Sequence, residues 1–388
     1  MRYNHGMPPE RAPGAPVEVT PVRSTLDRRA FLEFPWTVFR GDPLWVPPLR
    51  RDVATLLSPT INPFFEHAEM ACFLAERPTG TLVGRIAAIT NAAHGRVHPE
   101  EASVGFFGMF ESIDDQAVAD ALFAAAAAWL RERKMTVMRG PMNLSTNDDC
   151  GLLVDGFGTP PVVMMPYNPR YYVGLLERAR FTKAMDLLAY DGGREAVPER
   201  LRAAGPKLAA RYHITLRPLD MKHFWDEVAL VKDLYNKAWE KNWGFIPMTD
   251  AEMNHLAKQL KAVVVPELVV FASIGDKLIG FAIALPDFNV ALRSNRSGRL
   301  FPFGLFRILW NQRKIDRARV LTLGVLPEYR RTGADALMYE WLWRVSHRRG
   351  MPQGESSWIL ETNAAMRNGL ERMGFAVYKT YRVYDRRV

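Results

Sequence analysis

Two short patterns in this chain of 388 residues occur twice, at nearly the same separation. Residues 82–84 (LVG) recur as residues 278–280 (LIG), 196 positions later, and residues 175–181 (LLERARF) recur as residues 369–375 (GLERMGF), 194 positions later. A constant offset between two matches is harder to obtain by chance than either match alone. The sequence therefore predicts a fold of two similar domains, a number that the chain length also favours.

Each half has the same predicted order of elements. The first half is expected to hold two strands within 71–89, a strand at 104–110, a helix at 115–133, a strand at 136–140 and a helix at 170–179. The second half is expected to hold two strands within 269–285, a strand at 320–326, a helix at 334–348, a strand at 357–361 and a helix at 363–373. This order predicts an α/β fold in which each half is a mixed sheet flanked by helices.

Composition predicts the boundaries between these parts. Residues 1–18 are polar and rich in proline, and we expect them to form a disordered leader. A first domain is predicted at 19–190 and a second at 207–388. The range 191–206 contains glycines, prolines and several charges and is the predicted linker.

The composition also limits the partners and the compartment of the chain. The net charge of +9 favours polyanionic partners such as an anionic membrane, a phosphorylated cofactor or nucleic acid, but no DNA- or RNA-binding motif accompanies it, so we expect no nucleic-acid partner. Cys72 and Cys150 are the two cysteines, and the eight histidines are scattered, so neither a disulfide framework nor a metal site is expected. The absence of a signal peptide or membrane-spanning pattern, together with the few cysteines, is typical of a cytoplasmic protein.

A basic glycine loop precedes the predicted helix at 334–348. Gly333 lets the backbone come close to a ligand, and the first amides of the helix are unpaired and carry the positive end of its dipole. Arg330 and Arg331 add charged donors for phosphate oxygens. The loop therefore predicts a ligand that bears phosphate, although a surface turn with two solvated arginines is the alternative.

The sequence around this loop resembles a known family. Residues 325–337 (VLPEYRRTGADAL) are similar to the acyl-CoA loop of the GNAT (GCN5-related N-acyltransferase) superfamily, and residues 361–375 (ETNAAMRNGLERMGF) are similar to its second motif. The resemblance extends well over 213–386 and faintly over 68–190. It implies two tandem GNAT-like domains that use acetyl-CoA or a longer acyl-CoA as acyl donor, without a metal.

The resemblance also implies which residues bind the donor. Loop amides would hold the CoA pyrophosphate, and strand amides would bind pantetheine and polarise the thioester. The implied residues are Leu323, Gly324, Val325, Arg330, Arg331, Thr332, Gly333, Ala334 and Asp335. Two positions depart from the family pattern: Asp335 stands where the family has glycine or alanine, and Leu370 stands where many members have the tyrosine that returns a proton to the leaving thiolate.

The first half lacks this loop. Its strand at 104–110 runs into an acidic segment without glycine, in which Glu111, Asp114 and Asp115 would repel phosphate, and Arg180 replaces the glycine of the second motif. We therefore expect the N-terminal domain to be degenerate, without a cofactor, and to serve as scaffold or as a wall of the acceptor site.

Transfer of an acyl group to an amine needs a base that removes a proton from the amine. Glu361 and then Asp287 are the predicted candidates, because both stand at strand ends that face the cofactor; a cap or salt bridge is the alternative for each. Asn363 is a third candidate, with the role of helix N-cap as the alternative.

Two segments are predicted to form the acceptor site. Residues 235–248 follow a helix where the resemblance puts the acceptor loop, and residues 143–151 form a polar loop whose alternative is plain turn chemistry. The candidate binding residues in the first of these segments are Tyr235, Trp239, Asn242 and Trp243.

Residues 300–319 form an insertion that mixes apolar and basic side chains. They are Phe301, Phe303, Phe306, Leu309 and Trp310, with Arg307, Arg313, Lys314, Arg317 and Arg319. One interpretation is a helix at a membrane interface, which would favour a lipidic substrate and a location at the inner face of the membrane. The other is an amphipathic helix packed on its own sheet.

These observations predict a CoA-dependent N-acyltransferase that acts on a primary amine, with a lipid or long-chain amine as a candidate acceptor. The alternative is a non-catalytic acyl-CoA-binding or regulatory module, which the missing tyrosine and Asp335 would favour.

Overall fold

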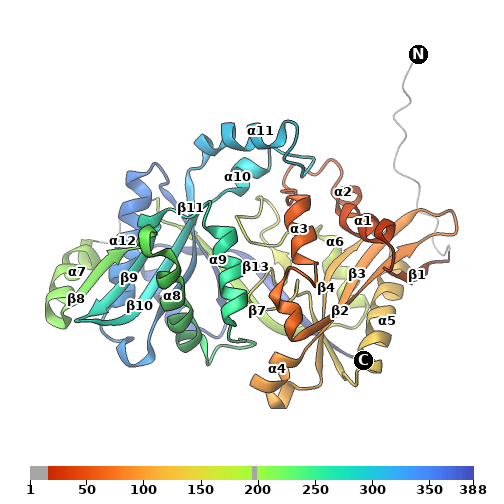
Figure 1. The fold of residues 1–388 in the computed structure, drawn as a ribbon, viewed down its shortest axis with the longest axis horizontal. Helices are drawn as coiled ribbons and strands as arrows, with labels where there is room; N and C mark the ends of the chain where they lie inside the picture. The colour runs from red at the N-terminus through yellow and green to blue at the C-terminus, as the bar shows by residue number, and fades with distance from the viewer. Residues whose placement is uncertain (1–15, 195–198) are drawn as a thin grey trace.

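A computed structural model describes residues 16–194 and 199–388 (Figure 1). The described strands form one mixed sheet of thirteen strands, in the order β1-β2-β3-β4-β5-β13-β7-β12-β11-β10-β9-β8, with β6 paired to β13. The strands are β1 (Glu18–Pro21), β2 (Ala68–Glu76), β3 (Leu82–Asn91), β4 (Val104–Ser112), β5 (Val137–Gly140), β6 (Leu152–Asp155), β7 (Thr182–Gly192), β8 (Ile214–Pro218), β9 (Val269–Ile274), β10 (Lys277–Pro286), β11 (Arg317–Val325), β12 (Gln353–Leu360) and β13 (Ala376–Arg387).

Helices cover both faces of this sheet. In the first half they are α1 (Thr25–Glu33), α2 (Pro35–Val38), α3 (Arg50–Leu56), α4 (Ala92–Val97), α5 (Gln116–Glu132) and α6 (Tyr171–Arg178). In the second half they are α7 (Glu199–Tyr212), α8 (Phe224–Trp239), α9 (Asp250–Leu260), α10 (Asn289–Leu292), α11 (Gly304–Asn311), α12 (Ala334–Arg348) and α13 (Ala364–Arg372). None of the described helices is long and apolar enough to cross a bilayer.

The predicted repeat is visible in the order of elements. The series β2-β3-β4-α5-β5-α6 in the first half has its counterpart in β9-β10-β11-α12-β12-α13 in the second. The predicted helix at 334–348 has the bounds of α12, and the predicted α/β class with a mixed sheet is confirmed.

The last strands of the two halves are exchanged. β13, at the end of the chain, pairs with β5 of the first half, and β7 of the first half pairs with β12 of the second, so that β13 and β7 lie side by side between the halves (Figure 1). The ranges 19–190 and 207–388 therefore do not close separate sheets. The range predicted as a linker contains the end of β7 and the start of α7, and most of the predicted leader lies outside the described residues.

The alternation of side chains along β10 shows which helices cover each face of the sheet in the second half. Phe281 and Ile283 of β10 pack with α8 and α9, whereas Ala282 and Ala284 pack with α12. Successive side chains of a strand point to opposite faces. Helices α8 and α9 therefore cover one face of the sheet and α12 the other.

In the first half, another segment of the chain occupies the edge of β4. Chain that follows β5 lies against it: the Met142 amide donates to the Phe107 carbonyl at 2.7 Å, and the Met109 amide donates to Asn143 Oδ1 at 2.8 Å. A Cβ atom at Gly108 would lie 2.0 Å from the Met142 carbonyl oxygen, so the approach needs glycine. Chain that follows β5 therefore occupies the edge of β4 beside Gly108.

Candidate functional site

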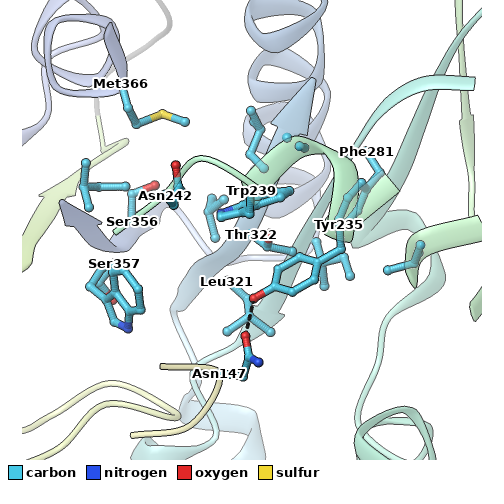
Figure 2. A pocket seen from close by; sticks show the side chains of 18 of the residues that line it. Asn147, Tyr235, Trp239, Asn242, Phe281, Leu321, Thr322, Ser356, Ser357 and Met366 are labelled. Atoms are coloured by element: carbon cyan, nitrogen blue, oxygen red, sulfur yellow. Dashed lines mark hydrogen bonds between the residues drawn. The ribbon is translucent and has the colours of Figure 1, made fainter. Parts of the chain in front are cut away.

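A cavity of about 760 Å³ lies where the second half meets the loop 143–151 of the first. Residues of α8 and α9 line it from one face of the sheet, and residues of α12 and α13 line it from the other. The cavity therefore passes through the sheet. Figure 2 shows Tyr235, Trp239, Ser356 and Met366, which come from these helices and from β12, around the same space.

The opening arises because β11 and β12 separate. Residues 317–320 pair in parallel with residues 353–356, and the ladder ends there. Beyond it, the predicted pantetheine-binding residues Leu323, Gly324 and Val325 line the cavity. A Cβ atom at Gly324 would lie 2.2 Å from the Trp239 ring, so only glycine lets the indole lie against the strand.

The predicted phosphate loop leads from β11 into α12. Gly333 has a φ of 79°, the left-handed conformation that glycine adopts without strain. The Arg330 guanidinium donates to the carbonyl oxygens of Ala238 at 2.9 Å and Val325 at 3.3 Å. Arg330 therefore braces the loop with backbone contacts, and Arg331 is exposed.

The first turn of α12 presents amide groups that no side chain caps. Its N-cap is Gly333, whereas α5 of the first half is capped by Asp115, whose carboxylate accepts from the Ala117 amide at 2.9 Å. Uncapped amides and the helix dipole favour an anion. Asp335 is exposed in this turn and lines the cavity, beside the position an anion would take. Of the other residues implied to bind the cofactor, Arg330 lines the cavity, while Arg331, Thr332, Gly333 and Ala334 are outside its described wall.

The two segments predicted to form the acceptor site, 143–151 and 235–248, are in contact. The Tyr235 hydroxyl donates to Asn147 Oδ1 at 2.8 Å (Figure 2). The polar loop of the first half is thus fixed to the end of α8 in the second. The predicted acceptor residues Tyr235, Trp239, Asn242 and Trp243 all line the cavity.

The two carboxylates predicted as base do not line the cavity. Lys183 Nζ donates to Glu361 at 2.7 Å, and the other carboxylate oxygen accepts from the Asp186 amide at 3.0 Å. Asp287 is buried and accepts from the Val163 amide at 2.8 Å. Both carboxylates hold the second half against the first, which is the bridging role considered as their alternative.

The third candidate, Asn363, lines the cavity but has its side chain engaged. It is the N-cap of α13 and accepts from the Met366 amide at 3.1 Å. Leu370 is buried in the core of the second half. Asn363 thus has the N-cap role considered as its alternative, and the Leu370 side chain has no proton to exchange.

Two aspartates that sequence reasoning did not select line the cavity. Asp148 and Asp149 follow Asn147 in the loop from the first half. Burial raises the pKa of Asp148 to about 7, and the Ser145 hydroxyl, which donates to it at 2.9 Å, offsets this only in part. Asp149 is open to the cavity, and burial raises its pKa too. The signal in the sequence was an acidic pair in a polar loop after a strand, which turn chemistry explains equally well.

Part of the predicted amphipathic insertion lies in the sheet. Arg319 is 3% exposed in β11 and donates to the Met164 and Ser357 carbonyls, both at 2.9 Å. Arg317 pairs with Asp191 at 3.1 Å. These two arginines belong to the contact between the halves, and the basic residues left at the surface of the insertion are those before β11.

Solved structures with this fold include GNAT proteins. A tandem GNAT protein from the clavulanic acid biosynthesis pathway has a TM-score of 0.54 at 12% identity, over 96% of this chain and 98% of that one. A GCN5-related N-acetyltransferase from Anabaena variabilis has a TM-score of 0.52 at 11% identity, over 96% of this chain and 72% of that one. The chain has the fold of a tandem GNAT protein, as its motifs predicted.

Two curated relatives match nearly the whole chain. Bacterial ceramide synthase of Caulobacter vibrioides is 37% identical over 379 residues, which cover 96% of this chain and 98% of the relative. Protein YghO of Escherichia coli is 36% identical over 370 residues, which cover 93% of both chains. No protein-family model matches the chain. The chain belongs to the family of these two proteins, which supports acyltransferase activity.

Proposed function

We propose that this protein transfers an acyl group from acyl-CoA to the amino group of a long-chain amine, forming an amide and free CoA. The observation that carries the proposal is the cavity through the sheet between β11 and β12. Such an opening lets a donor lie on one face and an acceptor on the other, with the reacting atoms held together in the gap.

We assign the donor to the side of α12 and α13. The uncapped amides of α12 and the exposed Arg331 would bind the pyrophosphate, and the free edge of β11 around Gly324 would bind pantetheine. The Thr322 hydroxyl faces the opposite side, because Thr322 pairs with Ile283, which packs with α8 and α9. It is buried, lines the cavity and has no hydrogen-bond partner among the described residues, so it is available to a bound ligand.

We assign the acceptor to the side of α8 and α9, where the wall of the cavity is mainly apolar. Its apolar members include Val228, Val231, Leu256, Leu260, Val264 and Phe281. A wall of this kind binds an alkyl chain by removing apolar surface from water, and it offers few partners to a small polar amine. The name of the Caulobacter relative also supports a lipid acceptor, because a ceramide is the amide of a long-chain amino alcohol.

Asp149 is the proposed base. It would take the proton that the amine loses as its nitrogen forms the new bond to the acyl carbon; the carbon–sulfur bond then breaks and CoA leaves as the thiolate. A carboxylate whose pKa is raised by burial is a stronger base near neutral pH than an ordinary aspartate.

Tyr339 of α12 is proposed to stabilise the leaving sulfur in place of the tyrosine that is missing at position 370. It lines the cavity, and burial raises its pKa to about 12, so it stays protonated and can donate a hydrogen bond. We expect Tyr339→Phe to lower kcat about ten- to hundredfold, which is the effect of one hydrogen bond to a developing charge, with little change in KM. Tyr212→Phe, outside the described cavity wall, is the matched control, and equal effects in both variants would contradict the role.

Turnover can be tested with palmitoyl-CoA and sphinganine, by measuring thiol release and identifying the amide by mass spectrometry. We expect product with sphinganine and none with ethanolamine, which has the amino alcohol group without the chain. Thermal-shift titration with CoA and palmitoyl-CoA measures binding separately. Binding without turnover would favour the non-catalytic acyl-CoA-binding module. The absence of a thermal shift with either compound would contradict both the acyltransferase and the acyl-CoA-binding module.

A further inference from the structure

We propose that α11 and the turn before it form a docking surface for an anionic lipid bilayer. We call this surface the α11 ridge. It consists of Phe301, Phe303, Leu305, Phe306, Leu309 and Trp310, with the neighbouring basic residues Arg307, Arg313 and Lys314.

Many of the exposed large apolar side chains lie on the α11 ridge. Among the described residues, thirteen large apolar side chains are exposed, and six of them lie between positions 301 and 310. Phe301, Phe303 and Phe306 are 75%, 67% and 68% exposed. Contiguous apolar surface of this kind marks an interaction site in soluble proteins.

The packing of α11 holds these side chains outward. Gly304 and Ile308, one turn apart, are the buried residues of the helix, and a Cβ atom at Gly304 would lie 1.8 Å from the Arg299 carbonyl oxygen. This face lies against the preceding residues of the insertion, among them Asn295 and Arg299. Phe306 and Trp310, also one turn apart, stack on each other with ring centroids 6.2 Å apart. The aromatic side of α11 therefore does not pack on the sheet, in contrast to the second interpretation of the sequence.

The charge around the ridge identifies the partner. Residues 300–315 contain Arg307, Arg313 and Lys314 as their charged residues and no aspartate or glutamate. Arg313 lies 3.7 Å over the Trp310 ring, so a cation and an apolar ring share one position at the surface. Aromatic side chains flanked by arginine and lysine suit the headgroup boundary of an anionic bilayer. A second copy of the ridge would instead bring like charges together.

The ridge stands next to the cavity. The insertion follows β10 and leads into β11, and Leu285 of β10 and Arg319 of β11 both line the cavity. At its base, Asn289 Nδ2 donates to the Pro161 carbonyl of the first half at 2.9 Å. Figure 1 shows α11 at the periphery of the molecule, above the junction of the two halves. A bilayer bound there would present its lipids beside the cavity, but the proposal depends on the surface alone and does not require the proposed reaction.

Vesicle flotation without acyl-CoA or amine tests the proposal. The full chain is mixed with vesicles of phosphatidylcholine alone, or of phosphatidylcholine with phosphatidylglycerol. We expect binding to the anionic vesicles, and at least a tenfold loss in Phe303→Ser/Phe306→Ser/Trp310→Ser. The matched control is Met221→Ser/Trp225→Ser/Leu230→Ser, which removes three exposed apolar side chains on and beside α8 and should float like the wild type.

A charge variant tests the basic residues of the α11 ridge separately from its aromatic residues. Arg307→Gln/Arg313→Gln/Lys314→Gln keeps the aromatic rings and should weaken binding to anionic vesicles about a hundredfold, since each basic residue near the surface contributes separately. An unchanged midpoint of thermal unfolding would show that each variant is folded. The proposal is overturned if the wild type floats with neither vesicle, if the control loses binding equally, or if the aromatic variant changes only the oligomeric state in size-exclusion chromatography.

Discussion

Asp149→Asn is expected to lower kcat by about 10²–10⁴-fold, the range by which a positioned general base accelerates a reaction. The amide is close to the carboxylate in shape but cannot take a proton from the amine. Because Asp149 lies in the loop from the first half and not in the α12 turn, the Kd for CoA should stay at the wild-type value. The measurements are the rate of amide formation from palmitoyl-CoA and sphinganine, and thermal-shift titration with CoA.

The pH profile tests the same residue independently. A base must be ionised to act, so kcat/KM should rise as pH increases through the pKa of Asp149, which burial raises above its usual range. The variant should lose this part of the profile. Asp148→Asn is the matched control: it keeps the Asp149 carboxylate, so the rise should remain and kcat should fall much less. A wild-type profile in Asp149→Asn would rule this residue out as the base.

Local patterns were enough to predict most elements. The strands and helices of both repeats appear in the predicted order, because apolar periodicity and turn residues are properties of short segments. The glycine turn at Gly333 was also predictable, since a positive φ favours glycine for a local steric reason.

Contacts between distant segments were not predictable in this way. The alternation of β13 suits any antiparallel neighbour, so nothing local shows that it pairs with β5 of the other half. The same exchange determines the position of Glu361. The end of β12 lies next to β7, where Lys183 binds the Glu361 carboxylate and holds it outside the cavity. Asp149 reaches the cavity only because a loop of one half lies against a helix of the other.

Arg319→Met is expected to lower the free energy of unfolding by about 3–5 kcal/mol, the cost of removing one partner of a buried ion pair. The guanidinium is 3% exposed and donates to the carbonyls of Val163 and Met164 in the first half and Ser357 in the second. Methionine would leave these carbonyls without their donor. It would also leave the Glu355 carboxylate, which is fully buried 3.6 Å from Arg319, without its cation.

The size of this loss should depend on pH. Burial raises the pKa of Glu355 to about 7, against the opposing effect of Arg319. A carboxyl group whose pKa is raised in the folded state stabilises the fold below its ordinary pKa, and that contribution is lost as pH rises through the folded value. Without Arg319 the pKa of Glu355 rises further. Arg319→Met should therefore lose more free energy of unfolding at pH values above about 7 than near pH 5, where the Glu355 carboxyl group is neutral in both the wild type and the variant.

Urea unfolding at acidic and at alkaline pH measures this difference, with the m-value as a check on two-state behaviour. The double variant Arg319→Met/Glu355→Gln has no buried carboxylate, so its loss of stability should be nearly the same at both pH values and should come from the orphaned carbonyls alone. If Arg319→Met were equally destabilising at both pH values, the ion pair would not be the main contribution of this residue. Because Arg319 also lines the cavity, a pH-dependent loss of stability would show that the same ion pair joins the two halves and supports the wall of the proposed active site.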